Sequence, residues 1–358
     1  MSYQIAFGPL ATPWRGPFRV VLRIAAERIT DIEQRDGYAA RGLAQRMPRL
    51  DLVHASALVS EVCSLHSHHH ALAWTLALEQ LAHKAVPPRA QALRLLVAEA
   101  ERAASHLQAA AVIVALLGLD ALHRALVETR ELVLNGMQLI TGHRLKPDFV
   151  VPGGVQHDLL PDEMAKLATL LARTAREIEA IIGRLVKQRG VRQRLGGIGR
   201  LSLASATELG MGGVVARACG SSADLRLDAP YAGYDRHAPR LVQQRDGDVT
   251  ARLFVLLLES YESQLLSQRL LHALPDGLWR GDPLPDVPAG TVSVGVEAPA
   301  GPLRYTLTSD GVRLTAVEIG SAPLPSRLVL RALLVGQSPE DAPLIVASLA
   351  PCAACAEG

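Results

Sequence analysis

The feature that most constrains this fold is a long central region with helical periodicity. In residues 90–117, apolar side chains recur three and four positions apart, as they do on the buried side of a helix. Pro87 and Pro88 stand just before this segment, where a helix start tolerates proline. The same pattern predicts further helices over residues 121–140, 161–188 and 251–274. We therefore expect the chain to fold around a bundle of long helices.

Both ends of the chain carry patterns typical of β-strands. Residues 18–24 form an apolar, β-branched run, and residues 28–32 look like its partner after a turn. Residues 290–320 alternate apolar and polar side chains, which predicts a small antiparallel sheet. Residues 195–247 are rich in glycine and are expected to be mostly irregular, and residues 328–334 are expected to form a last helix.

These patterns together predict an α+β fold, mainly a helical bundle core with small antiparallel β regions from the N-terminal and C-terminal segments. We expect an N-terminal β region over residues 1–50 and a helical core domain over residues 51–289. Residues 290–358 are expected to form a C-terminal β segment and to return a cysteine motif to the core.

Composition narrows the range of partners. Hydrophobic residues make up 49% of the chain and charged residues 20%, which suits a globular protein with a sizeable core. The net charge is +2 and the arginines are dispersed, so no nucleic-acid partner is expected. The N-terminus does not resemble a signal peptide, and the most apolar run, residues 109–119, is too short to span a bilayer. We expect a cytoplasmic protein whose four cysteines are not disulfide-bonded.

Two short motifs carry the most specific chemistry. The first, Cys63-Ser64-Leu65-His66, is a C-x-x-H sequence, and the second, Cys352-Ala353-Ala354-Cys355, is a C-x-x-C sequence. Either motif can place two donors on one metal ion where the backbone turns between them. Taken alone, each motif is a weak signal of a metal site. The alternative is that these cysteines are simply buried.

Three further histidines follow the first motif. On a helix, His66 and His70 share a face, while His68 and His69 point elsewhere. We interpret His68 and His69 as polar residues at a subunit contact. The glycines of residues 196–199 follow a basic segment rather than a strand, so we expect no dinucleotide binding by this chain. Cys219 matches no ligand position and is expected to be a small buried residue.

The motifs, taken in order, resemble those of one family. They are Gly37-Tyr38 with Arg41-Gly42, Glu99 to Leu107, Arg130-Glu131, Thr141-Gly142, Pro152-Gly153-Gly154-Val155, Arg217 to Tyr234, and Gly247-Asp248 with Glu259. This series, with cysteine motifs near both ends, is similar to the large subunit of membrane-bound, energy-converting NiFe hydrogenases and to the 49-kDa core subunit of respiratory complex I. The resemblance implies that the two cysteine motifs meet in the core as metal ligands, at Cys63, His66, Cys352 and Cys355.

The chain departs from the hydrogenase pattern at four positions. His66 stands where the family has a cysteine that bridges nickel and iron, and an imidazole does not bridge two metals as a thiolate does. Alanine replaces three other family residues: the Glu of a proton relay at Ala44, an Arg beside the iron ligands at Ala300, and an Asp at Ala350. These changes argue against a nickel–iron centre and favour zinc or iron. The complex I branch differs as well, because residues 10–16 contain none of the histidines that help that branch bind quinone.

The resemblance implies the redox-core large subunit of a hydrogenase-like or complex I-like membrane complex with an altered metal site. Its expected partners are an iron–sulfur small subunit, which carries the cluster, and other hydrophilic and membrane subunits that hold the chain on the inner face of the membrane. Quinone or protons are candidate reactants. Two alternatives stay open: a non-catalytic structural subunit that keeps the fold, and a working NiFe hydrogenase with unusual ligands.

Overall fold

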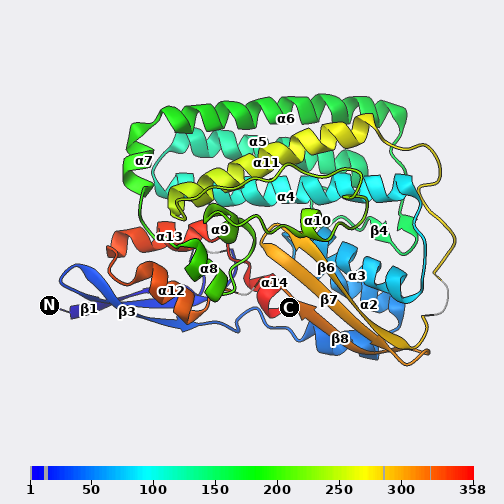
Figure 1. Ribbon diagram of the computed structural model, residues 1–358, viewed down its shortest axis with the longest axis horizontal. Helices are drawn as coiled ribbons and strands as arrows, with labels where there is room; N and C mark the ends of the chain where they lie inside the picture. Colours follow the sequence, from blue (N-terminus) through cyan, green and yellow to red (C-terminus); the bar gives the residue numbers. More distant parts are fainter. Residues whose placement is uncertain (1, 12–14, 285–286, 323) are drawn as a thin grey trace.

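The structure is a computed structural model and describes residues 2–11, 15–284, 287–322 and 324–358. Four long helices form a bundle along one side of the molecule, and two three-stranded sheets lie beneath it (Figure 1). The bundle consists of α4 (Pro88–Leu116), α5 (Asp120–Thr141), α6 (Pro161–Lys187) and α11 (Val249–His272). None of the described helices combines the length and the apolar composition of a bilayer-spanning segment.

The bundle helices differ in how much of their surface they bury. Helix α6 is amphipathic: Leu167, Leu171 and Ile178 are buried, and the opposite face is exposed. Helix α4 is buried on nearly all sides, because α5, α11 and the loops beneath it surround it. Polar and charged side chains on α4 are therefore buried too, and they must find partners inside the protein.

The N-terminal sheet has the order β1-β2-β3, with β1 (Ser2–Phe7), β2 (Arg19–Ala25) and β3 (Arg28–Arg35) antiparallel. Along β2, Val20, Leu22 and Ile24 are buried and alternate with more exposed residues, as in a sheet with one covered face. Helix α12 (Arg327–Leu334) packs on β3. Strand β1 lies outside the predicted strands, because its side chains are mostly exposed and give no clear alternation.

The second sheet has the order β6-β7-β8, with β6 (Gly290–Ala298), β7 (Gly301–Ser309) and β8 (Leu314–Gly320) antiparallel. The alternating residues Leu303, Tyr305 and Leu307 of β7 are buried. Helix α3 (Ser67–Leu81) packs on β6 and β7. The alternating pattern of residues 290–320 therefore predicted this sheet correctly.

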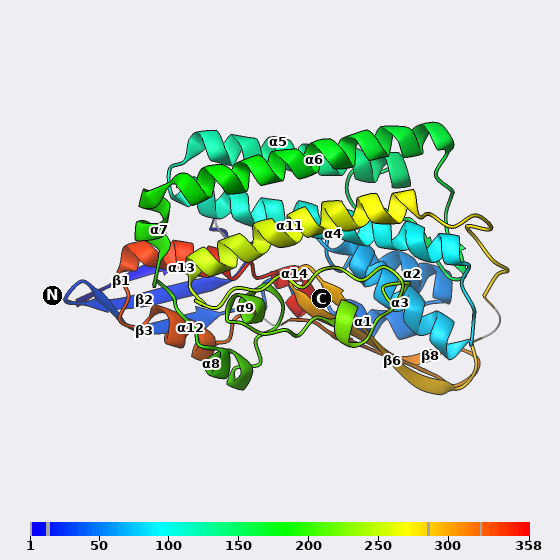
Figure 2. The same ribbon diagram turned by 45° about the horizontal axis from the view of Figure 1, so that its top comes forward.

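Short elements connect these layers: α1 (Leu43–Arg46), η1 (Met47–Arg49), α2 (Leu52–Val59), β4 (Val150–Val151), β5 (Gly154–Val155), α7 (Arg189–Leu195), α8 (Leu203–Glu208), α9 (Gly213–Ala218), α10 (Leu225–Asp228), η2 (Pro339–Asp341), α13 (Ala342–Ser348) and α14 (Ala353–Glu357). The glycine-rich residues 195–247, expected to be mostly irregular, contain only short helices. The predicted α+β class is confirmed. The division into three segments stays a prediction. In both views α14 lies beneath the bundle, between the two sheets (Figures 1 and 2).

Candidate metal centre

The first cysteine motif lies in the loop that joins α2 to α3. The loop leaves α2 at Val59 and buries Cys63 before it reaches the next helix. His66 stands at the N-terminal end of α3, where its backbone carbonyl accepts a hydrogen bond from the His70 N–H (3.1 Å). The start of α3 therefore fixes the backbone of His66.

The second motif reaches the same place from α13. Ala350 has a φ of 47°, a left-handed conformation, and the chain then extends through Pro351. Cys352 is the residue just before the first turn of α14, and Cys355 lies within that helix. The Ser321 hydroxyl donates to the Cys355 carbonyl at 2.7 Å.

Helix α14 is also attached to the N-terminal part of the chain. The Glu357 carboxylate accepts hydrogen bonds from the backbone N–H groups of Gly37 (2.8 Å) and Ala39 (2.6 Å). A side chain at Gly16 would meet Ala353, since a Cβ there would lie 2.7 Å from the Ala353 Cβ. The position of α14 therefore depends on contacts with residues more than 300 positions earlier.

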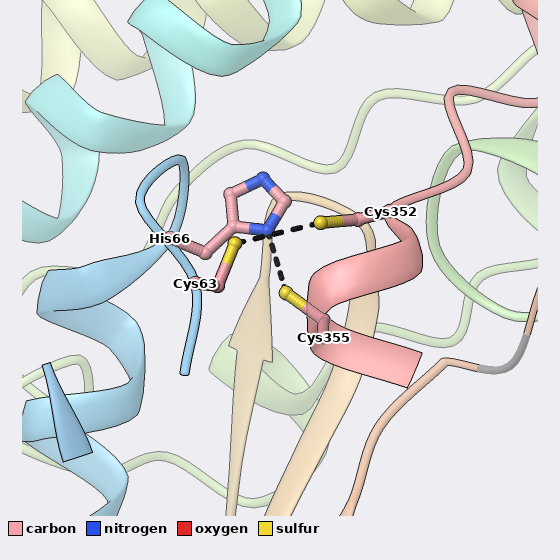
Figure 3. Close-up of side chains that lie close together, drawn as sticks. All are labelled: Cys63, His66, Cys352 and Cys355. Carbon is pink, nitrogen blue, oxygen red and sulfur yellow. Dashed lines mark hydrogen bonds between the residues drawn. The ribbon is translucent and has the colours of Figure 1, made fainter. Parts of the chain in front are cut away.

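The four predicted ligands converge. Their donor atoms, one from each of Cys63, His66, Cys352 and Cys355, all lie within 4.8 Å of one another (Figure 3). The Cys63 and Cys352 Sγ atoms are 3.5 Å apart, and the His66 Nδ1 is 3.1 Å from the Cys355 Sγ. All four side chains are buried, with exposures between 0% and 6%. The spatial prediction that the two motifs lie side by side is thus realised in this structure.

Burial and mutual contact set the protonation of this cluster. Burial lowers the pKa of His66, but the neighbouring sulfurs of Cys63 and Cys352 outweigh it and raise that pKa to about 10. Hydrogen bonds from the Cys355 and Cys63 thiols hold the pKa of Cys352 well below its usual value. The same hydrogen bond to Cys352 raises the pKa of Cys355. Without a metal, the cluster favours a Cys352 thiolate beside a protonated His66.

The far side of the His66 ring has its own partner. The His66 Nε2 lies 2.9 Å from the Ser105 hydroxyl on α4, and Arg15 donates to that hydroxyl at 2.7 Å. A metal-bound histidine needs such a partner, which fixes the tautomer and the ring orientation. Nδ1 faces the sulfurs and Nε2 faces a hydroxyl, so the ring is oriented for ligation through Nδ1.

A second histidine lies behind Cys355. The His70 Nε2 is 3.3 Å from the Cys355 Sγ, and its Nδ1 is 2.8 Å from the Tyr305 hydroxyl. Burial lowers the pKa of His70 to about 3, so its ring is neutral. Sequence patterns did not identify His70 and Tyr305 as site residues, because their contacts depend on how α3 packs against β7.

His68 and His69 are not at a subunit contact, and the sequence-based interpretation was wrong. Both are 0% exposed. The His69 Nδ1 lies 2.5 Å from the Glu101 carboxylate, which also accepts from the backbone N–H groups of both histidines. The His68 Nε2 is hydrogen-bonded to the Arg94 carbonyl at 2.9 Å. No local pattern marks Glu101 as their partner, because it lies one layer away on α4.

Two of the alanines that stand in place of hydrogenase residues, Ala300 and Ala350, lie next to the site. Ala300, at the turn between β6 and β7, packs against the cysteine cluster, and Ala350 is buried two residues before Cys352. Ala44 is buried in α1. Residues 12–14 of the loop compared with the quinone-binding branch lie outside the described residues. Cys219 is buried in the main core, as expected, and burial raises the pKa of its thiol.

The fold and the site together define a class of protein: a large subunit with a helical bundle core, in which two distant motifs bring candidate metal ligands together in the interior. Residues 117–285 match the family described as the 49-kDa subunit of respiratory-chain NADH dehydrogenase. The chain is 31% identical to the carbon monoxide-induced hydrogenase of Rhodospirillum rubrum, over 99% of each chain. It is 29% identical to one of the subunits of the NADH-quinone oxidoreductase of Thermosipho melanesiensis, over 98% of each chain.

A solved structure is similar as well. It comes from the membrane-bound sulfane sulfur reductase, an archaeal respiratory membrane complex, with a TM-score of 0.93 and 26% identity, and the match covers 100% of this chain and 98% of that one. The chain therefore belongs to the family of NiFe hydrogenase large subunits and complex I 49-kDa-type core subunits, as its motifs predicted.

Proposed function

We propose that this chain is the redox-core large subunit of a membrane-bound respiratory complex and that Cys63, His66, Cys352 and Cys355 hold one tetrahedral iron ion. The observation that carries the proposal is the convergence of four buried donors from two distant motifs within 4.8 Å. When bound, such an ion can accept and release an electron, which zinc cannot do.

The donor set fits one ion better than two. In a tetrahedral site with metal–sulfur bonds of about 2.3 Å, two sulfur ligands lie about 3.8 Å apart. The Cys63–Cys352 separation of 3.5 Å is close to that value. The hydrogenase pattern uses two bridging thiolates, and at the position of one of them the His66 Nδ1 has a single lone pair to give. Its Nε2 is already hydrogen-bonded to Ser105.

Residues around the site would also set the reduction potential of the bound ion. Ser105 orients the His66 ring, and Arg15 adds a positive charge near that side of the site. Burial excludes water and makes the field of each neighbouring dipole stronger. His70 and Tyr305 place a neutral hydrogen-bonding pair behind Cys355, and hydrogen bonds to ligand sulfurs shift the potential of iron–thiolate sites.

The partners follow from the same proposal. The relatives include part of an NADH-quinone oxidoreductase, and the similar structure is part of a respiratory membrane complex. We expect an iron–sulfur small subunit to exchange electrons with this site, and membrane subunits to hold the chain on the inner face of the membrane. Quinone is one candidate for the terminal reactant.

Elemental analysis of the purified protein tests the metal. We expect about one iron per chain and no nickel. Cys352→Ser should remove most of the iron, while Cys219→Ser, which removes a buried thiol elsewhere, should retain it. Zinc at one per chain would contradict a redox role and favour the structural alternative. Nickel together with iron would favour a hydrogenase with unusual ligands, and metal-free protein would overturn the proposal.

A further inference from the structure

A groove with a volume of about 790 Å³ lies beside α2 and α3, away from the N-terminal sheet. In Figure 1, α2, α3, β4 and the turn between β7 and β8 gather at that end of the molecule. Residues of these elements line the groove, together with Arg280, Leu284 and Val287 from the segment before β6. None of its described lining residues is a candidate metal ligand, so this α2–α3 groove is separate from the metal centre.

The deepest walls of the α2–α3 groove are mainly apolar. Five apolar residues of its lining are no more than 9% exposed: Trp74, Leu78, Val150, Val287 and Leu314. Thr75 is the one buried polar residue among the described lining residues. The Ser56 hydroxyl, also in the lining, donates to the Leu52 carbonyl at 2.6 Å and accepts from the Trp74 Nε1 at 2.9 Å. The floor therefore offers an occupant apolar surface and few free hydrogen-bonding groups.

Small side chains on two helices keep the α2–α3 groove open. Ser56 and Ser60 of α2 are four residues apart and share one face of that helix, with Ala57 next to Ser56. Ala71 of α3 lines the same space. A larger side chain at Ala57 or at Ala71 would therefore occupy volume that is now open.

Two arginines stand at the mouth of the α2–α3 groove. Among the described residues that line it, the charged ones are Asp148, Arg280 and Arg313, and all three are exposed. Arg313 has one ion pair, with Asp310 at 4.0 Å, and such a long, exposed pair is weak. Arg280 has no ion pair within the described part of the chain. Both guanidinium groups are therefore available to an anionic ligand.

Size and chemistry restrict what this groove can hold. Its volume falls in the range of about 300–1,000 Å³ that is usual for small-molecule sites. An extended peptide fits poorly, because each of its residues brings a backbone N–H and a C=O that need partners, and the floor offers few. A molecule with an apolar body leaves no polar group unpaired against Trp74 and Leu78. An acidic group at one end would match the arginines at the mouth.

We infer that the α2–α3 groove binds a fatty-acid-like amphiphile, with its apolar chain on Trp74 and Leu78 and its carboxylate at Arg280 and Arg313. A guanidinium matches a carboxylate through two parallel hydrogen bonds, which gives the head group its selectivity. The inference goes beyond the proposed function, because binding needs neither the metal nor a partner subunit. Only the source of the ligand, a membrane held nearby by the proposed complex, rests on that proposal.

Dodecanoate, kept below its micelle concentration, is the probe for the apolar part of the groove. Isothermal titration calorimetry of the full chain should show saturable binding of one molecule per chain. Ala57→Trp should weaken that binding at least about tenfold, because the indole takes the place of the ligand chain. Ala121→Trp adds the same side chain at an exposed position of α5 and should leave the affinity unchanged. Ala71→Trp fills the groove from α3 and serves if the first variant does not fold.

Dodecanol, which lacks the charge, tests the role of the arginines. It should bind the unaltered chain at least about threefold more weakly than dodecanoate does. The double variant Arg280→Gln with Arg313→Gln should bind dodecanoate no better than dodecanol. Arg124→Gln, which removes an exposed arginine from α5, should keep the preference for dodecanoate. Equal affinities for the two probes in the unaltered chain would contradict the assignment of the carboxylate to the arginines.

Three further results would overturn the inference. They are the absence of saturable dodecanoate binding, undiminished binding in both tryptophan variants, and loss of binding once the chain is assembled with its partner subunits. The last result would show that a partner subunit covers the groove. The metal content of the same preparations separates this inference from the proposed function. Dodecanoate bound to metal-free protein would keep the groove and reject the iron site, whereas iron without dodecanoate binding would do the reverse.

Discussion

At the scale of single residues, His66 was predicted from the sequence as a candidate ligand, whereas the residues that hold its ring in place were not. The motif spacing, together with the family resemblance, singled out Cys63, His66, Cys352 and Cys355 as candidate ligands. The residues that position these side chains could not be identified from the sequence in that role. Ser105 lies on a helix 39 residues after His66, and only the packing of α3 on α4 brings the two together.

Ser105→Ala tests whether that hydroxyl positions the His66 ring. Loss of such a partner commonly weakens metal binding by about 10–100-fold. We expect the dissociation constant for the bound ion, measured by chelator competition, to rise within that range, with the circular dichroism spectrum unchanged. Thr169→Ala removes an exposed hydroxyl from α6 and should leave the dissociation constant as it was. Equal affinities for the two variants would show that Ser105 has no such role.

Sequence patterns could not identify the partners of the buried histidines. A polar run such as residues 68–70 is usually solvated, but here the Arg94 carbonyl meets one ring nitrogen of His68 and Glu101 meets one ring nitrogen of His69. Long-range pairs of this kind depend on tertiary contacts, whereas ligand spacing is a local property of the chain. That difference explains why the candidate ligands could be named from the sequence and their hydrogen-bond partners could not.

At the scale of elements, the bundle is tied to the loops beneath it by buried ion pairs. Glu99 on α4 accepts hydrogen bonds from Arg226 of α10 (3.2 Å) and from Ser263 of α11 (2.5 Å). Arg217 of α9 donates to Glu259 of α11 at 2.6 Å. Such pairs are costly to break singly, since the remaining charge is then buried without a partner. The periodicity of α4 predicted the helix, but it did not predict that the polar residues of α4 form buried ion pairs with α10.

Stability at low pH should report on Glu99. Burial raises its pKa, but Arg226 and Arg102 outweigh burial and lower it from 4.5 to about 2. A lowered folded-state pKa stabilises the fold above the unfolded value and loses that effect as pH falls. We expect the free energy of unfolding to fall by about 3 kcal/mol from this group between pH 5 and pH 2.

Urea denaturation across this pH range measures the effect. Glu99→Gln should be less stable near neutral pH by about 3 kcal/mol and should show a shallower decline below pH 5. Glu318→Gln, at an exposed position of β8, should follow the unaltered protein. An unchanged slope in Glu99→Gln would mean that other carboxylates control the acid transition.

At the scale of the whole molecule, the C-terminal helix α14 is hydrogen-bonded to the N-terminal part of the chain. The N-terminal loop near Gly37 and the helix that carries Cys355 are joined through Glu357, so both ends contribute to the position of the site. Composition and strand alternation predicted the α+β class. The order in which the layers contact one another could not be derived from them, because periodicity reveals which face of an element is buried but not against what.

Glu357→Ala should weaken the attachment of α14 to the loop at residues 37–39. Hydrogen bonds to a charged group contribute about 1.5–3 kcal/mol each, and most of that loss should fall on α14 alone. We expect faster amide exchange in residues 353–357 and faster metal release to a chelator, with little change in the melting temperature. Glu340→Ala, an exposed carboxylate at η2, is the matched control. Unaltered metal release would show that α14 is held by its packing rather than by Glu357.

The separation of the two motifs has a consequence for biosynthesis. Cys352 and Cys355 leave the ribosome 289 residues after Cys63 and His66. Before the second motif is made, a nascent polypeptide would offer an incoming ion only half of the proposed coordination sphere. Four-ligand binding would therefore require that synthesis has passed the second motif and that α14 has docked, so an occupied centre would mark a polypeptide in which both motifs have come together.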